Sequence, residues 1–153
     1  MKIEEAIKQK SFESEHLKLV INILYTGSWL SLKNTELLKP YNLTLPQYNV
    51  LRILRGQHPE PATVNLLIDR MLDKMSNASR IVDKLITKKL VSRKHSEEDR
   101  RCVDVIITEK GLKMLAEIDK AQAEWLGFLK HMSKSDAKTL NELLDKVRSS
   151  VDH

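Results

Sequence analysis

The stretch that decides the fold is "SNASRIVDKLITKKLVSRKHSEEDRRCVDVIIT", residues 76–108. Its first half repeats apolar residues at helical spacing, because Ala78, Val82 and Leu85 fall on one face of a helix. Beyond this helix the apolar residues alternate with polar ones, in "VSRKHS" and "CVDVIIT", a spacing that is typical of strands. The charged segment "EEDRR" (97–101) joins the two. The stretch therefore predicts a helix followed by a β-hairpin.

Two shorter helices are expected before this unit. In "LTLPQYNVLRIL" (43–54), Thr44 precedes Gln47 by three residues, an arrangement typical of a capping box, and the helix should run from about residue 45 to Gly56. The prolines of "QHPEPATV" interrupt the pattern. A third short helix then spans about residues 64–71, and Ser76 is the expected N-cap of the helix that follows.

Long helices are expected at both ends of the chain, over about 14–38, 109–130 and from Ser133 to the C-terminal region. Each has apolar residues on more than one side or at spacings of three and four, so each needs more than one neighbour. Association of two chains through these helices would supply that neighbour. Burial of the terminal helices within a single chain is the alternative.

Composition limits the class of protein. A chain of 153 residues with 41% hydrophobic content can form one domain with a sizeable core. The net charge of +5 favours an acidic partner if the basic residues cluster. The single cysteine, Cys102, excludes an internal disulfide, and the charged N-terminus has neither a signal peptide pattern nor a membrane span. We therefore expect a soluble, cytoplasmic protein.

The order of three helices and a hairpin between about residues 45 and 108 describes a winged helix-turn-helix, whose last helix enters the major groove of double-stranded DNA. Base edges in that groove are read by short polar side chains and by arginine on the exposed N-terminal half of the helix. Ser76, Asn77 and Arg80 occupy that position, and Lys84 is better placed for a phosphate. A merely solvated charged face is the alternative.

The hairpin would be the wing of this fold. Arg100 and Arg101 at its tip can enter the minor groove or bind backbone phosphates, and Asp99 can hold an arginine in position. Arg93 and Lys94 on the first strand add to the same basic surface. A surface turn whose charges compensate one another is the alternative.

The slightly longer segment "MSNASRIVDKLITKKLVSRKHSEEDRRCVDVIITEKG" (75–111) resembles the core of the MarR family of bacterial transcriptional regulators. Its most specific parts are "ASRIVDKLITKKLVSR" and "EDRRCVDVIITEKG", which contains a D-x-R element. One departure is Lys89, at a helix end where the family commonly has glycine. The resemblance implies a two-fold dimer on a pseudo-palindromic operator.

The resemblance also implies the DNA contacts. The residues that would face the major groove are Ser76, Asn77, Ala78 and Arg80, and the D-x-R pair of the wing would be Asp99 and Arg101. The expected fold is thus mainly α with a small β-hairpin wing. Residues 1–153 would form one domain, with a DNA-binding lobe at about 45–108 and dimerisation helices at about 1–38 and 109–153.

Other chemistry finds little support in the sequence. We find no nucleophile elbow, phosphate loop or zinc-protease motif, and the five histidines form no helical pair, so we expect neither an enzyme nor a cofactor or metal. Cys102 begins a predicted strand and is expected to be a small, half-buried structural residue. The alternative is a thiol that senses oxidants, with a pKa lowered by Arg100 and Arg101.

The sequence, read together with the family resemblance, thus leads us to expect a homodimeric, ligand-responsive repressor of transcription. Its small-molecule effector would bind at an apolar junction around Tyr25, Trp29 and Tyr48, and shift the spacing of the two recognition helices. Two other functions stay open. A nonspecific architectural DNA-binding protein would show salt dependence without sequence preference, and a protein-interaction module would use its terminal helices on another protein.

Overall fold

A computed structural model describes residues 1–95 and 103–149, with residues 94, 95 and 103 described by their backbone alone. It divides into two compact units, Met1–Ile118 and Asp119–His153. In chain order the elements are α1 (Ile3–Ala6), α2 (Glu15–Leu38), the 3-10 helix η1 (Lys39–Tyr41), α3 (Leu45–Gln57), β1 (Ala62–Thr63), α4 (Val64–Arg70), α5 (Ala78–Thr87), β2 (Val91–His95), β3 (Val103–Ile107), α6 (Glu109–Trp125), the 3-10 helix η2 (Leu126–Leu129) and α7 (Lys134–Ser149).

The helices that precede the decisive stretch begin where their capping residues predict. The hydroxyl oxygen of Thr44 accepts from the backbone N–H of Gln47 at 3.3 Å, and the Gln47 side chain accepts from the Thr44 N–H at 3.2 Å, which confirms the capping box of α3. Thr63 caps α4 through the N–H of Leu66. The predicted short helices are therefore both present.

The start of α5 differs from the prediction by one residue. Its N-cap is Asn77 and not Ser76, because the Asn77 side-chain oxygen accepts from the N–H of Arg80 at 3.0 Å. The hydroxyl of Ser76 instead donates to the carboxylate of Asp73 at 2.6 Å and closes the preceding turn. The helix therefore begins at Ala78.

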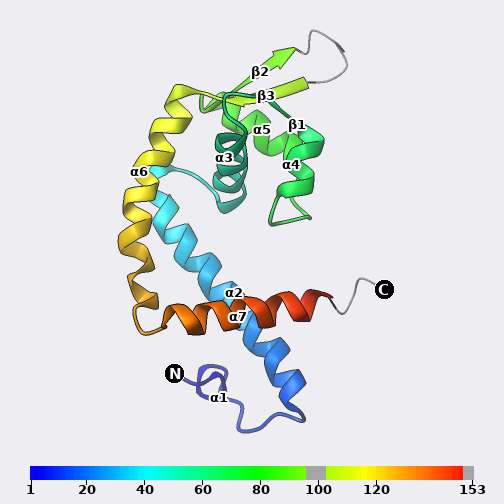
Figure 1. Cartoon of the computed structure of the whole chain (residues 1–153), viewed down its shortest axis with the longest axis vertical. Helices are drawn as coiled ribbons and strands as arrows, with labels where there is room; N and C mark the ends of the chain where they lie inside the picture. The colour runs from blue at the N-terminus through cyan, green and yellow to red at the C-terminus, as the bar shows by residue number, and fades with distance from the viewer. Residues whose placement is uncertain (96–102, 150–153) are drawn as a thin grey trace. The chain divides into compact units, whose positions relative to one another are not determined.

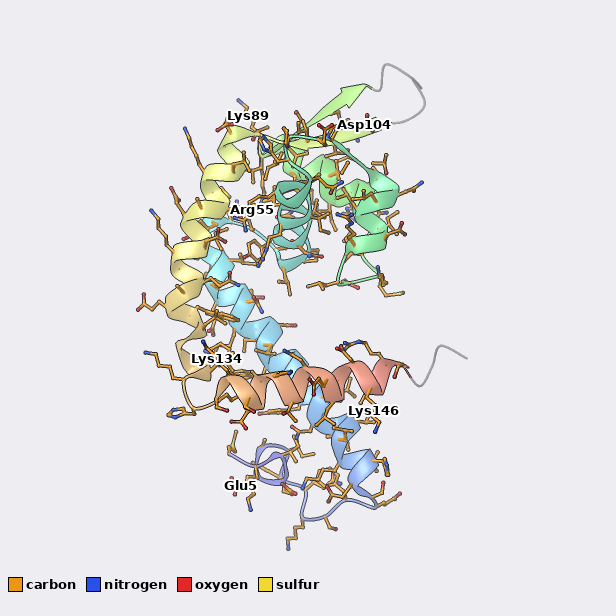
Figure 2. All side chains as sticks on the ribbon, viewed as in Figure 1. Glu5, Arg55, Lys89, Asp104, Lys134 and Lys146 are labelled. Carbon is orange, nitrogen blue, oxygen red and sulfur yellow. The ribbon has the colours of Figure 1, made fainter. Side chains whose placement is uncertain are left out.

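Lys89, the residue that departs from the family pattern, lies just after the end of α5. Lys89, labelled in Figure 2, has a left-handed backbone with φ of 61°. The N–H of Lys89 donates to the carbonyl of Ile86 at 2.8 Å and that of Leu90 donates to Leu85 at 3.0 Å, the two bonds of a Schellman motif. A lysine thus adopts the conformation that glycine would adopt with less strain.

The sheet has one strand more than the predicted hairpin. Its order is β1-β3-β2, all antiparallel, with Ala62 opposite Val105 and Val91 opposite Ile107. Figure 1 shows β2 and β3 as a hairpin beside the start of α6, with α3, α4 and α5 gathered on one side of it. The alternation predicted for β3 is confirmed at Val105 and Ile107, which are both buried.

The core of the first unit joins these helices to the sheet. Its fully buried side chains are Leu38, Val50, Leu51, Leu54, Leu67, Val82, Leu85, Leu90, Val105, Leu115 and Ile118. The start of α6 is fixed by Thr108, whose N–H donates to the Leu90 carbonyl at 3.0 Å and whose hydroxyl donates to the Lys89 carbonyl at 2.9 Å. The wing and α6 are therefore tied to the end of α5.

The second unit contains the end of α6, η2 and α7. The predicted helix over 109–130 is α-helical to Trp125 and continues as η2 to Leu129. Ser133 and Asp136 form the expected cap of α7: the Ser133 hydroxyl accepts from the Asp136 N–H at 3.0 Å, and the Ser133 N–H donates to the Asp136 carboxylate at 3.1 Å. Between Lys134 and Ser149, α7 has no buried residue.

Candidate nucleic-acid interface

The face that α5 presents to solvent is set by the face that it buries. Ala78, Val82 and Leu85 are all buried in the core, as their spacing predicts. Arg80 and Lys84 lie one turn apart on the opposite side and are exposed. This corrects one prediction from the family resemblance, because Ala78 is only 3% exposed and its side chain therefore does not face a groove.

The polar residues at the N-terminus of α5, Ser76 and Asn77, already form hydrogen bonds within the chain. The side-chain oxygen of Asn77 caps the helix, so its NH₂ group is the part left to meet a base or a phosphate. Ser76 is half-buried, and its hydroxyl, together with the N–H of Met75, lowers the pKa of the Asp73 carboxyl. The turn before α5 is thereby held by hydrogen bonds to the Asp73 carboxylate.

An ion pair connects α5 to the wing. The Arg93 guanidinium on β2 pairs with the carboxylate of Asp83 on α5, and both side chains are about half exposed. Arg93, which was predicted to contact DNA, therefore has an acidic partner in this structure. The negative charge of Asp83 is correspondingly directed toward β2.

The end of α5 is tied to the beginning of α3. Lys88 extends its ammonium group to the carbonyl of Asn42 and, at 3.2 Å, to the side-chain oxygen of Gln47. The Gln47 side chain is 4% exposed. Lys88 thus serves a structural role, although its position in the sequence continues the basic face of Arg80 and Lys84.

A depression of about 410 Å³ opens between the N-terminal ends of α3 and α5. The residues that line it are Thr44, Pro46, Gln47, Ser76, Asn77, Arg80, Ile81 and Lys84. Four of these, Ser76, Asn77, Arg80 and Lys84, were predicted to contact DNA. The structure therefore brings the predicted contacts of α5 together and adds the start of α3 to them.

The sequence did not predict that the start of α3 would line this depression, although it did predict the start of the helix. Thr44 and Gln47 form a recognisable capping box, which locates the helix but not its neighbour. Their proximity to Arg80 depends on how α3 packs against α5, and helical spacing within either segment does not contain that information.

The remaining predicted DNA contacts belong to the wing. Lys94 lies on β2, described by its backbone alone, and its neighbour across the ladder is Asp104. Asp99, Arg100 and Arg101 lie outside the described residues, as does Cys102, the candidate oxidant sensor.

The three aromatic residues assigned to an effector pocket have different surroundings. Tyr25 and Trp29 are four residues apart on α2, and each is 37% exposed. Tyr48 on α3 is 5% exposed and belongs to the core, with Arg52 donating to its hydroxyl at 3.5 Å. Tyr25 and Trp29 are therefore accessible to a ligand, whereas Tyr48 is buried.

The described part of the chain offers neither a metal cluster nor a helix suited to a bilayer. Among those residues, no three or more His, Cys, Asp or Glu side chains gather as a group that could hold a metal ion. Nor does any helix within them combine the length and the apolar character that crossing a bilayer requires.

Comparison with known proteins identifies the family. Residues 43–103, which include α3, α4, α5 and β2, match the MarR family. Residues 43–103 of this chain therefore form a MarR-family domain. With this domain and the winged-helix fold the chain is a regulator of transcription, and members of this family are not enzymes.

The curated relatives match most of the length of this chain. It is 29% identical to the HTH-type transcriptional regulator MgrA of Staphylococcus aureus over 119 residues, 78% of this chain and 79% of MgrA. It is 25% identical over 148 residues to the transcriptional repressor MprA of Escherichia coli K12, 96% of this chain and 84% of MprA. The fold is shared with the organohalide-sensing regulator RdhR-CbdbA1625 bound to 2,4-dichlorophenol, at a TM-score of 0.81 and 20% identity, covering 93% of this chain and 83% of that one.

Proposed function

We propose that this chain is a ligand-responsive repressor that binds a pseudo-palindromic operator as a homodimer. The observation that carries the proposal is the orientation of α5: its apolar face is anchored in the core, while Arg80, Lys84 and the NH₂ group of Asn77 are presented to solvent. The MprA relative is named a transcriptional repressor, which supports repression as the outcome.

The DNA contact proposed for each residue follows from the chemistry and position of its side chain. Arg80 reads a guanine edge in the major groove, because its guanidinium is exposed in the first turn of α5. Lys84, one turn further along, binds a phosphate. Arg100 and Arg101 of the wing bind the minor groove or its phosphates, and Asp99 holds an arginine in position. Affinity would come mainly from the basic residues and specificity from the first turn of α5.

The test is fluorescence anisotropy of the purified protein with labelled duplexes tiled across the DNA upstream of its own gene. Scrambled duplexes serve as competitors, at two salt concentrations. Tight binding to one fragment that survives competition supports the proposal. Equal, salt-sensitive binding to every fragment would instead indicate an architectural protein, and no binding at low salt would indicate a protein-interaction module.

Variants locate the interaction on the proposed surface. Arg80→Ala should weaken binding to the selected fragment by about tenfold or more and relax its preference at one base pair, since one good bidentate pair discriminates by about 1–3 kcal/mol. Lys113→Ala, an exposed lysine on α6, is the matched control and should bind as the wild type does. A loss of affinity that is equal in both variants would argue against reading by α5.

The proposed homodimer is supported by apolar side chains that each unit leaves exposed. On α2 these are Leu17, Leu19, Val20, Leu24 and Leu32, and on α7 they are Leu140, Leu143 and Val147. Surfaces of this kind mark interaction sites. Light scattering after gel filtration should give twice the 17.7 kDa chain mass.

Leu24→Asp tests the same proposal by substitution. Leu24 is 68% exposed, so a carboxylate there should leave the fold of a single chain intact. The variant should elute at the single-chain mass with an unchanged circular dichroism spectrum. A variant that kept the double mass would show that α2 is not part of the interface.

An effector is proposed to bind beside Tyr25 and Trp29, the exposed aromatic pair on α2. The ligand-bound structure of the organohalide-sensing regulator supports a small apolar compound as its chemical class. Compounds that release the operator should change the emission of Trp29, measured in a Trp125→Phe background that removes the second tryptophan. An operator-releasing compound that left Trp29 emission unchanged would place the site elsewhere.

A further inference from the structure

The depression between α3 and α5 has the electrostatic character of an oxyanion site. No acidic side chain is among the eight residues that line it, whereas Arg80 and Lys84 are. Neither of these two cations has a carboxylate within ion-pairing distance in the described part of the chain. The nearest acidic residue in sequence, Asp83, is paired with Arg93 on β2.

Two helix N-termini add to this positive potential. The depression is lined by Thr44, the N-cap of α3, and by Asn77, the N-cap of α5. Each helix end carries roughly half a positive charge and backbone N–H groups that lack partners within the helix. Because α3 and α5 span 13 and 10 residues, both are long enough for this effect.

Gln47 provides an independent indication of a ligand. The N–H of Thr44 and the ammonium group of Lys88 both donate to its side-chain oxygen, each at 3.2 Å, which fixes the oxygen on that side of the amide. The amide nitrogen Nε2 then points the other way and has no acceptor among the described residues. Gln47 is only 4% exposed, yet no fully buried side-chain nitrogen among the described residues lacks a partner, so Nε2 retains access to solvent. Because Gln47 lines the depression, we take this donor to open into it.

We propose that this depression seats one phosphate of the DNA backbone. Nε2 of Gln47 would donate to a phosphate oxygen from the floor of the depression, while Lys84 neutralises the phosphate charge from the side. The depression thus brings the two cations Arg80 and Lys84 together with the amide donors of Gln47 and Asn77, a combination that suits an oxyanion. The inference rests on the proposed DNA-binding function and adds to it the start of α3 as a second anchor.

The decisive variant is Gln47→Glu. A glutamate keeps the shape of the side chain and both acceptor contacts, to the Thr44 N–H and to Lys88, but it replaces the Nε2 donor by an oxygen. Gln57→Glu is the matched control, because it introduces the same charge on α3 near Arg70, the partner of Gln57. We expect Gln47→Glu to weaken operator binding by about tenfold or more, a loss appropriate to one charged hydrogen bond, with little change for Gln57→Glu.

The phosphate itself is identified by scanning the best duplex from the tiling experiment with single neutral methylphosphonate substitutions. The wild type should lose affinity at one particular phosphate in each half-site, and Gln47→Glu should lose nothing further at that phosphate. Lys84→Gln, an exposed substitution that cannot disturb the core, should show the same coupling and keeps the test decisive if Gln47→Glu folds poorly.

The outcomes separate this inference from the function on which it rests. Operator binding by the wild type with no coupling between Gln47 or Lys84 and any phosphate would overturn the phosphate seat and leave the repressor proposal intact. Failure of the wild type to bind any duplex would overturn both. A third arm adds inorganic phosphate: a shift of the Gln47 side-chain amide resonances without coupling to DNA would indicate a site for a free oxyanion, and so would also overturn the backbone seat.

Discussion

Of the glycines, Gly111 in the first turn of α6 is the one that leaves the least room for a side chain. A Cβ atom at this position would lie 2.5 Å from the carbonyl oxygen of Leu90 and 2.7 Å from Cγ1 of Ile107. The first of these neighbours is backbone and cannot rotate away, and it also accepts the N–H of Thr108 at 3.0 Å. Gly111→Ala should therefore force α6 away from the wing and weaken that hydrogen bond.

The change in the free energy of unfolding caused by Gly111→Ala is the sum of two opposing effects. Overpacking a well-filled site costs about 1–3 kcal/mol, and more where the neighbour is backbone. The higher helix propensity of alanine returns at most about 1 kcal/mol. We expect a net loss of about 2–3 kcal/mol in the free energy of unfolding, which for a chain of this size lowers the melting temperature by roughly 5–10 °C.

The assay is thermal and urea unfolding followed by far-ultraviolet circular dichroism, with Gly56→Ala as the control. Gly56 lies near the end of α3 and is exposed, and outside its own helix backbone no neighbouring atom lies within 4 Å of the position that a Cβ would occupy. Alanine there should be neutral or stabilising by up to about 1 kcal/mol. If Gly111→Ala proved as stable as Gly56→Ala, the close approach of α6 to Leu90 would be wrong.

Three further predictions follow from single contacts. Lys89→Gly should stabilise the protein by about 1 kcal/mol in urea unfolding, because glycine adopts the left-handed conformation without a Cβ penalty. The hydroxyl and N–H of Ser133 lower the pKa of Asp136. The stability that this cap provides is therefore present above the pKa of an unfolded aspartate and is lost as the pH falls through the lower pKa of the folded protein. Ser133→Ala should raise the Asp136 pKa in a carboxyl NMR titration. Asp83→Asn should change the free energy of unfolding by less than about 1 kcal/mol. It should also steepen the slope of log binding constant against log salt concentration by up to about 0.9, measured by anisotropy, because Arg93 is then free to bind a phosphate.

Much of the DNA-binding lobe could be predicted because its signals are local. The capping box of Thr44 and Gln47, the buried stripe of α5 and the alternation in β3 each depend on residues a few positions apart. Such signals fix the type of an element and the face that it buries. They locate its first residue less well, as the choice between Ser76 and Asn77 shows, since both can cap a helix and only the contact with Asp73 decides.

Features that depend on contacts between distant segments could not be predicted in the same way. The strand β1 is two residues long, too short for an alternating pattern, and exists because Ala62 and Thr63 pair with β3, which is distant in the sequence. The family resemblance placed Ala78 on the DNA face, although its own helical spacing with Val82 and Leu85 already indicated burial. Where the two disagreed, the periodicity of this sequence was the better guide.

The polar contacts around α5 suggest why the recognition helix would hold a defined angle on DNA. An apolar face alone lets a short helix slide or rotate, because hydrophobic burial is not directional. Here the Asp73 turn and the Asn77 cap fix its beginning, Asp83 ties its middle to Arg93 on β2, and Lys88 ties its end to Gln47 on α3. Because α3 and β2 both lie within the unit Met1–Ile118, a force that displaces this unit would move the reading face as one piece. An effector would then act by changing the distance between two such units in a dimer, and it would not need to deform either recognition helix.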